Sequence, residues 1–280
     1  MNTIVVDCHG LCHRAKHSMG DLEYDLQRTG VIFGFMSEMY RLAKSFNPCK
    51  FVFAWDSKDS LRKMVYPQYG RHHDGEEYTE EDIIAFEQFS TIRDVVIPEM
   101  GFANSFLYSG LEADDIIASV VKNYAGKFII VSSDHDLYQL LAQNVEIYSP
   151  YSKKMMTHSE FYAKWGILPI KWAEVKAYAG CNSDNVPGIE RVGEVTAAKF
   201  LRKALRPTTQ AYKDILLNQE LFERNMKLVK IPFEGTPTPV INNEERLSLD
   251  GFLRVCQRYG FTSMLDKESI RLWKQLFDLT

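Results

Sequence analysis

Short apolar segments alternate with longer amphipathic segments along the first half of the chain. Five segments are short and rich in Val, Ile and Phe, as buried parallel strands are. These predicted strands are Thr3–Asp7, Lys50–Asp56, Ser105–Tyr108, Lys127–Ser132 and Val145–Tyr148. Helical patterns lie between them at Leu26–Ser45, Thr79–Ile97 and Glu112–Tyr124. The alternation predicts an α/β fold, with a mostly parallel central sheet and helices on both faces.

The strand pattern fades after about residue 157. Thr157 is suited to cap one helix, and Pro169 to open another that runs to Tyr178. Further helices are predicted at Val195–Ala204, Gln210–Val229, Leu249–Tyr259 and Ile270–Leu279. We therefore expect an α/β core over residues 1–178 and a helical C-terminal module over residues 179–280.

Composition is that of a soluble globular protein. The 280 residues are 45% hydrophobic and 25% charged, and no apolar run approaches the ~20 residues that cross a bilayer. The chain begins with a strand-like segment, so we expect neither a signal peptide nor a membrane partner. Five scattered cysteines indicate reduced thiols and a cytoplasmic location.

Charge is distributed unevenly, although the net charge is only −4. Between Arg191 and Lys213 six residues are basic and only Glu194 is acidic, whereas between Asp74 and Asp94 eight are acidic and only Arg93 is basic. Either run alone is also typical of a solvated helix face. The basic run keeps a nucleic-acid partner open despite the acidic total.

Acidic residues recur at the ends of the predicted strands. The residues in question are Asp7, Asp56, Glu112, Asp114, Asp115, Asp134 and Asp136. Ligands of an open parallel sheet bind beyond the carboxyl ends of its strands. Clustered carboxylates repel one another unless a cation neutralises them, and oxygen ligands without histidine favour Mg²⁺ or Mn²⁺. Each acid alone has a plainer explanation as a helix cap or loop residue.

Three segments resemble the motifs of a known family. Gly110–Asp115, Val131–Asp136 and Gly180–Gly188 are similar to motifs of the 5′-nuclease family, and Asp7 and Asp56 fall in the family's order. That family comprises bacteriophage 5′–3′ exonucleases, flap endonucleases and the 5′-nuclease domain of bacterial DNA polymerase I. The resemblance runs from about residue 3 to about residue 232. It implies a metal-dependent nuclease that acts near 5′ ends during replication or repair, in a bacterial or phage-infected cell.

The resemblance implies two metal ions. Asp56, Glu112 and Asp114 would hold one ion, with Asp7 acting through water. Asp134, Asp136 and the turn that contains Asp184 would hold the other, with Asp114 or Asp115 nearby. Two such ions can stabilise the attacking and departing oxygens of an in-line phosphoryl displacement, and one lowers the pKa of a bound water.

The resemblance also implies how DNA would be held. The turn before Gly193 and the helix from Val195 resemble the family's helix–three-turn–helix, in which Ser183 would be a K⁺ ligand. An ordinary helix hairpin is the alternative. The residues expected to contact DNA or RNA·DNA duplexes with 5′ single-stranded ends are Lys63, Tyr69, Arg71, Gly188, Arg191, Gly193, Lys199, Arg202 and Lys203. Residues 62–97 match the family's helical arch, whose aromatic Tyr66 and Tyr69 suit either base stacking or core packing.

The chain departs from the family at two places. Cys181 stands where the family has an aspartate that binds the second metal, and a thiol is a poor Mg²⁺ ligand. Gly70 and His73 stand where the family has a lysine and an arginine; Lys63 or Arg71 could replace the lysine. Cys8-His9 and Cys12-His13 supply zinc-ligand types, but no second pair with matching spacing follows.

Three functions compete. The first is a 5′ nuclease, expected to be monomeric and to work beside replication proteins. The second is a branched-DNA-binding protein on the same fold, with weak cleavage because of Cys181 and Gly70. The third is an unrelated hydrolase of the phosphatase kind, which would not need the turn at Asp184–Gly193.

Overall fold

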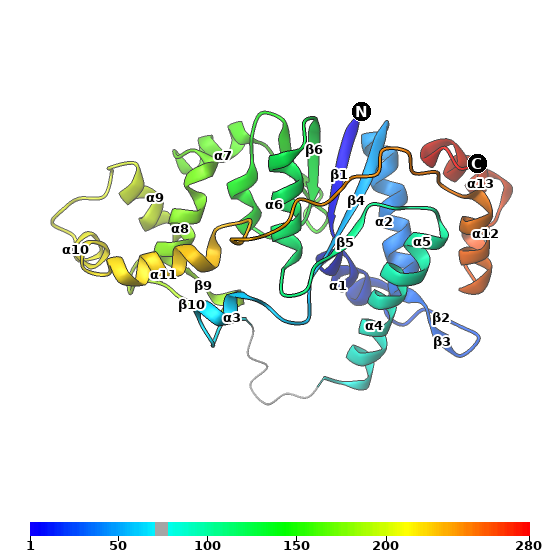
Figure 1. Ribbon diagram of the computed structural model, residues 1–280, viewed down its shortest axis with the longest axis horizontal. Coiled ribbons are helices and arrows are strands. Elements are labelled where there is room, and N and C mark those ends of the chain that lie inside the picture. The colour runs from blue at the N-terminus through cyan, green and yellow to red at the C-terminus, as the bar shows by residue number, and fades with distance from the viewer. Residues whose placement is uncertain (71–77) are drawn as a thin grey trace. The chain divides into compact units, whose positions relative to one another are not determined.

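The computed structural model describes residues 1–70 and 78–280 and confirms the predicted α/β fold with mostly parallel strands. The chain divides into two compact units (elements labelled in Figure 1). The first unit comprises Met1–Trp55, Glu77–Phe106 and Pro239–Thr280, and the second comprises Asp56–Glu76 and Leu107–Thr238. None of the described helices is long and apolar enough to span a membrane.

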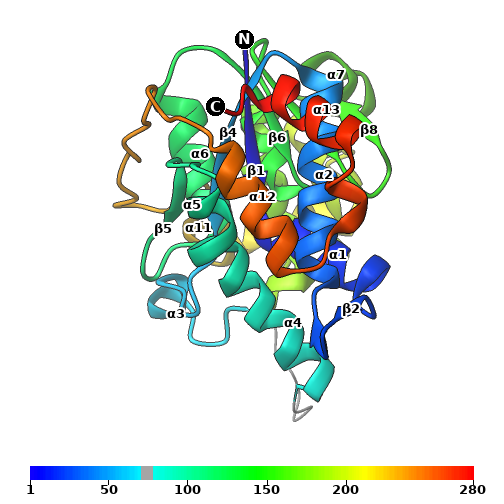
Figure 2. The same ribbon diagram turned by 90° about the vertical axis from the view of Figure 1, so that its right-hand side faces the viewer.

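The first unit contains the N-terminal strands and both ends of the chain. Strands β1 (Asn2–Asp7), β4 (Cys49–Trp55) and β5 (Ser105–Leu107) lie in the order β5-β4-β1, and β1 runs parallel to β4. Helices α1 and α13 pack against α2 (Figure 2). Its other elements are α1 (Cys8–Met19), β2 (Glu23–Tyr24), β3 (Gln27–Arg28), α2 (Gly30–Phe46), α4 (Glu80–Thr91), η1 (Ile92–Val96), α5 (Ile97–Glu99), α12 (Leu249–Arg258), η5 (Thr262–Met264) and α13 (Lys267–Phe277).

The core of the first unit is aromatic. Phe51 packs on Phe53 and Phe277 with ring centroids 5.8 and 5.7 Å apart, and all three rings are buried. The predicted helix Thr79–Ile97 is confirmed as three consecutive helical segments, the middle one a π-helix. Pro98 follows this π-helix, and a proline has no N–H to continue the regular ladder.

The second unit contains the rest of the strands and most candidate site residues. Strands β6 (Lys127–Val131), β7 (Val145–Ser149) and β8 (Lys154–Met156) lie in that order, with β6 parallel and β8 antiparallel to β7. Its helices and small hairpin are α3 (Arg62–Val65), α6 (Ala113–Asn123), η2 (Asp136–Leu140), α7 (His158–Trp165), η3 (Pro169–Lys171), α8 (Trp172–Ala179), β9 (Gly180–Cys181), η4 (Asn182–Asp184), β10 (Val186–Pro187), α9 (Glu194–Leu201), α10 (Gln210–Leu217) and α11 (Gln219–Val229).

Two predicted helices were wrong in detail. The helix predicted from Leu26 begins at Gly30, because Asp25 and Leu26 have positive φ and form the turn of the β2–β3 hairpin. The helix predicted over Gln210–Val229 is two helices, separated at Asn218 by a non-helical backbone conformation. The division into a core of residues 1–178 and a module of residues 179–280 stays a prediction, as does the arch over residues 62–97.

Candidate active site

Asp56 is held beside the start of α6 by backbone hydrogen bonds. Its Oδ1 accepts the N–H of Ala113 at 2.7 Å, and the N–H of Leu61 donates to Gly110 O at 2.8 Å. Gly110 has φ +79°, and a Cβ there would lie 2.7 Å from Leu61 Cγ, so only glycine allows this close approach. Burial raises the pKa of Asp56, and the nearby Asp115, Asp134 and Asp184 raise it further.

Glu112 precedes α6, and three side chains hold its carboxylate. Ser60 Oγ donates to Oε1 at 2.7 Å, the Tyr69 hydroxyl donates to Oε2 at 3.0 Å, and Arg62 Nη1 lies 3.3 Å from Oε2. Burial raises the pKa of Glu112, and the Arg62 charge opposes that shift. All three partners come from residues 60–69, so this segment fixes the orientation of the acid.

Asp115 is saturated by donors of the protein itself. Its side chain is fully buried, and Arg62 Nη1 and Nη2 donate to its two oxygens at 2.7 and 2.8 Å. The N–H groups of Glu112 and Phe233 donate to it at 3.2 and 2.7 Å. A carboxylate has about four acceptor sites, and all four are taken. The geometry therefore favours a positioning role over the predicted metal contact.

Asp114 lies in the first turn of α6 and is half-buried. Asp134 follows β6, and its Oδ1 accepts the N–H of Asp136 at 2.7 Å. Asp136 opens η2 and pairs with a buried ammonium, because Lys176 Nζ of α8 lies 2.8 Å from its Oδ1. Burial raises the pKa of Asp136 to about 6; the Asp134 charge adds to this, and Lys176 opposes it.

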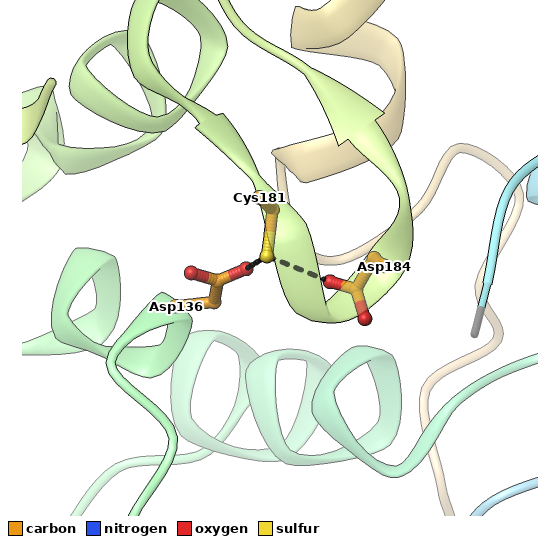
Figure 3. Close-up of side chains that lie close together, drawn as sticks. All are labelled: Asp136, Cys181 and Asp184. Carbon is orange, nitrogen blue, oxygen red and sulfur yellow. Dashed lines mark hydrogen bonds between the residues drawn. The ribbon is translucent and has the colours of Figure 1, made fainter. Parts of the chain in front are cut away.

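Cys181 lies in the β9–β10 hairpin between two carboxylates (Figure 3). Its Sγ is 3.1 Å from Asp184 Oδ2 and 3.6 Å from Asp136 Oδ2, and Ser183 Oγ is 2.9 Å away. Burial raises the pKa of Cys181 to about 12, with the charges of Asp136 and Asp184 adding to it. The sulfur is therefore a thiol at neutral pH. Asp136, Cys181 and Asp184 are the one group of three or more candidate metal ligands among the described residues.

Asp7 belongs to the first unit. It caps α1, and its Oδ1 accepts the N–H of Gly10 at 2.9 Å. Its place in the metal cluster stays a prediction. Cys8, His9, Cys12 and His13 do not form a candidate metal-ligand group among the described residues, and the two imidazoles pack edge-on against aromatic rings. His9 lies 5.7 Å from Trp55 and His13 lies 5.1 Å from Phe89 between ring centroids.

The described basic residues that are predicted to contact DNA differ in whether they already pair with an acidic side chain. Lys63, Lys199, Arg202 and Lys203 are exposed, and the described residues offer them no ion-pair partner. Arg191 is exposed but pairs with Glu190 at 2.7 Å and Asp214 at 3.3 Å. The predicted Arg71, and His73 at the family's arginine position, lie outside the described residues.

The remaining predicted DNA contacts have distinct surroundings. Tyr69 is buried, so its ring packs in the core and its hydroxyl serves Glu112 rather than a base. Gly188 packs closely within the hairpin, since a Cβ there would lie 2.0 Å from Ala179 O. A Cβ at Gly193 would meet open space, so the start of α9 is accessible. Ser183 is exposed, and its K⁺ role stays a prediction.

Sequence reasoning missed three residues that organise these acids: Ser60, Arg62 and Lys176. None belongs to a pattern of its own, and an arginine or lysine on a short helix is usually exposed. Their signal is a tertiary one, namely burial beside carboxylates that come from distant parts of the chain.

Known proteins similar to this chain decide its family. A family model described as the 5′–3′ exonuclease N-terminal resolvase-like domain matches residues 2–166. The chain belongs to the 5′–3′ exonuclease family. The predicted resemblance is thereby confirmed.

The relatives differ in length. Thermostable DNA polymerase I of Thermus aquaticus is 29% identical over 204 residues, a match that covers 71% of this chain but only 24% of the polymerase. A 5′–3′ exonuclease of Aquifex aeolicus is 28% identical over 207 residues, covering 72% of this chain and 67% of the exonuclease. The match thus spans about a quarter of the polymerase.

Solved structures share the fold at low sequence identity. T5 5′-exonuclease with bound divalent metal ions (zinc) superposes with a TM-score of 0.71 at 20% identity, over 100% of this chain and 99% of that one. The catalytic core of Rad2 in complex with DNA substrate gives a TM-score of 0.58 at 12% identity, over 99% and 92%.

Proposed function

We propose that this protein is a structure-specific 5′ nuclease that hydrolyses phosphodiester bonds near 5′ ends with the help of divalent metal ions. The carrying observation is a set of carboxylates in the second unit, most of them at least partly buried, at positions that match the family's motifs. Asp56, Asp136 and Asp184 all have raised pKa values because of burial and mutual repulsion. A bound cation would remove that repulsion, so the cluster fits a metal centre.

The first ion would be held by Asp56, Glu112 and Asp114. Such ions stabilise the negative charge that develops on phosphate oxygens during an in-line displacement. Ser60, Tyr69 and Arg62 would keep the Glu112 carboxylate in one orientation. The T5 exonuclease, which shares the fold, binds divalent metal ions, and this supports the use of a divalent metal. We propose Mg²⁺ or Mn²⁺ as the physiological ion.

Asp115 would not bind the ion itself but would act through Arg62 on the metal ligand Glu112. Its bidentate pairing fixes the guanidinium of Arg62, whose Nη1 also approaches Glu112. Outer-shell partners of this kind orient metal ligands and influence metal affinity. We therefore propose Asp115 as a positioning residue.

DNA would bind at the start of α9 and along the basic residues that follow. Amides at a helix start attract phosphate, and Gly193 leaves room for close approach. Lys199, Arg202 and Lys203 would contact backbone phosphates, which position a duplex without identifying its bases. The DNA complex of the Rad2 core supports a DNA partner. K⁺ binding near Ser183, RNA·DNA substrates, replication partners and a bacterial or phage-infected cytoplasm complete the proposal.

A second function is a branched-DNA-binding protein with weak cleavage. The observation that favours it lies at the second metal position, where the sulfur of Cys181 stands beside Asp184 and the ammonium of Lys176 pairs with Asp136. Both features weaken the case for a hard second ion. The two functions share DNA binding and differ only in the rate of hydrolysis.

The test is incubation of the protein with a 5′-labelled flap in Mg²⁺, in Mn²⁺ and in EDTA. We expect cleavage in at least one metal, none in EDTA, and loss of cleavage but retained binding for Asp134→Asn. Asn218→Asp, in the linker between α10 and α11, is a control that also alters one charge. Tight flap binding without cleavage in either metal would favour the second function, and neither binding nor cleavage would contradict both.

A further inference from the structure

We propose that Asp136, Cys181 and Asp184 form an ion-selective site, which binds a thiophilic divalent ion such as Cd²⁺ or Zn²⁺ through sulfur in preference to Mg²⁺. The proposal concerns the second metal position of the proposed nuclease. Its test measures metal binding without DNA, so it does not depend on cleavage.

The three donor atoms lie close to the spacing that such an ion requires. Zinc lies about 2.3 Å from sulfur and about 2.1 Å from a carboxylate oxygen in tetrahedral sites, which places the two ligand atoms about 3.6 Å apart. Cys181 Sγ is 3.6 Å from Asp136 Oδ2 and 3.1 Å from Asp184 Oδ2. The three ligand atoms all lie within 4.8 Å of one another. An ion can therefore enter with small side-chain movements.

The hairpin holds the sulfur in place. Cys181 is only 5% exposed and packs in an apolar cluster with Ala177, Val186 and Leu228. It pairs with Val186 across the β9–β10 hairpin. A ligand fixed by its surroundings loses little conformational freedom when it binds.

The two carboxylate oxygens of Asp136 face different partners because Lys176 pairs with only one of them. Its ammonium lies 2.8 Å from Oδ1, so Oδ2 is left facing Cys181. Lys176 also lies 3.3 Å from Glu194 Oε1, which balances its charge. The carboxylates of Asp136, Asp184 and Glu194 and the ammonium of Lys176 together carry a net charge of −2 around the neutral thiol. A divalent cation is therefore still attracted, and the lysine acts as an outer-shell group that orients the carboxylate.

Ion selectivity follows from the chemistry of the thiol. Binding breaks the S–H bond, forms a metal–sulfur bond and releases one proton to water, with no change of oxidation state. A thiophilic ion forms a strong bond to sulfur, whereas Mg²⁺ requires near-octahedral oxygen ligands. The family's aspartate at this position would have no such preference.

The test is a Cd²⁺ titration of the metal-free protein, followed by the ultraviolet sulfur-to-cadmium charge-transfer band. We expect one saturable equivalent that a large excess of Mg²⁺ does not displace. Cys181→Ser should abolish the band, and Asp184→Asn should weaken Cd²⁺ binding roughly tenfold or more. Cys49→Ser and Cys256→Ser are matched controls that should keep it. Cys181→Asp should lose the band and gain Mg²⁺ binding by calorimetry.

Several outcomes would overturn the proposal. They are a band that persists in Cys181→Ser, displacement of Cd²⁺ by Mg²⁺ at comparable concentration, or a band lost in a control variant. Circular dichroism and thermal unfolding show whether each variant is folded, and Cys181→Asp provides a second test if Cys181→Ser fails to fold. A protein that shows the band but does not cut a flap would retain this site and lose the proposed nuclease function. A protein that cuts the flap but lacks the band would keep the proposed nuclease function and lose this site.

Discussion

Arg62 and Asp115 form a buried ion pair with two nearly parallel hydrogen bonds of 2.7 and 2.8 Å. Arg62 is 2% exposed and Asp115 is 0% exposed. Arg62 Nε donates to Leu228 O at 2.7 Å, and the guanidinium lies over the Phe233 ring. The pair thus connects α3, the start of α6 and the segment after α11. Arg62 Nη1 also lies 3.3 Å from Glu112 Oε2. Arg62 therefore both stabilises the fold and contacts a proposed metal ligand.

We predict that Arg62→Met lowers the free energy of unfolding by about 3–5 kcal/mol, because it leaves Asp115 charged and buried without its partner. Arg62→Lys should cost less, since it keeps the charge and loses the bidentate geometry. Urea unfolding followed by circular dichroism measures both. Lys63→Met is the matched control, because Lys63 is the exposed neighbour and should change stability by less than about 0.5 kcal/mol. A loss below about 1 kcal/mol for Arg62→Met would contradict the prediction.

We predict that Tyr69→Phe raises the metal concentration needed for half-maximal cleavage severalfold. The variant removes the hydroxyl that donates to Glu112 Oε2 at 3.0 Å, and one such bond contributes about 1 kcal/mol. The maximal rate at saturating metal should change less, because the acid itself remains. Tyr66→Phe is the control, since Tyr66 stacks on Arg224 through its ring. An unchanged metal requirement for Tyr69→Phe would show that the hydroxyl does not position Glu112.

We predict that charge reversal at Lys199 and Arg202 together weakens duplex binding and flattens its salt dependence. Each lost phosphate contact should reduce the slope of log affinity against log salt by about 0.9. Fluorescence anisotropy with a flap substrate across a salt series measures both quantities. Lys153→Glu and Lys154→Glu, at the β7–β8 turn, give a control with the same charge change. Equal affinity and slope for the parent and the Lys199, Arg202 variant would exclude this surface from DNA contact.

We predict that divalent metal stabilises the protein more at pH 7.5 than at pH 4.5. Burial raises the pKa of Asp136 from 3.8 to about 6 and also raises those of Asp56, Glu112 and Asp184. A carboxyl whose pKa is higher in the folded state binds more protons there. The metal-free protein should therefore lose stability as pH rises from about 4 to about 6. A bound cation removes this penalty only when the acids are ionised.

Thermal unfolding with and without saturating Mn²⁺ at the two pH values checks this. Asp136→Asn should reduce the metal-induced rise in Tm at pH 7.5, whereas Asp278→Asn, at the end of α13, should not. A Tm rise of equal size at both pH values would mean that the raised carboxyls are not where the ion binds.

Local patterns predicted much of the secondary structure. All five predicted strands are present. In four of them Val, Ile and Phe side chains are buried, whereas β5 is short and none of its residues is fully buried. Thr157 caps α7 through a reciprocal hydrogen-bond pair with Glu160, as a capping residue should. The pattern failed for α1, whose two Cys-His pairs masked an amphipathic helix, and for the short β8, β9 and β10, which are too brief for a period.

The sequence by itself determined the fold class and the family and supplied a set of candidate acids, because these depend on residue identity, order and spacing. Only the tertiary structure decided how the acids differ. In the folded chain Asp115 forms hydrogen bonds with Arg62, and Asp136 forms an ion pair with Lys176. The Cys181 thiol lies between the carboxylates of Asp136 and Asp184. The partners in each case come from segments far apart in the chain. Hydrogen bonds, burial and the resulting pKa shifts depend on distance in space, which a local sequence pattern does not encode.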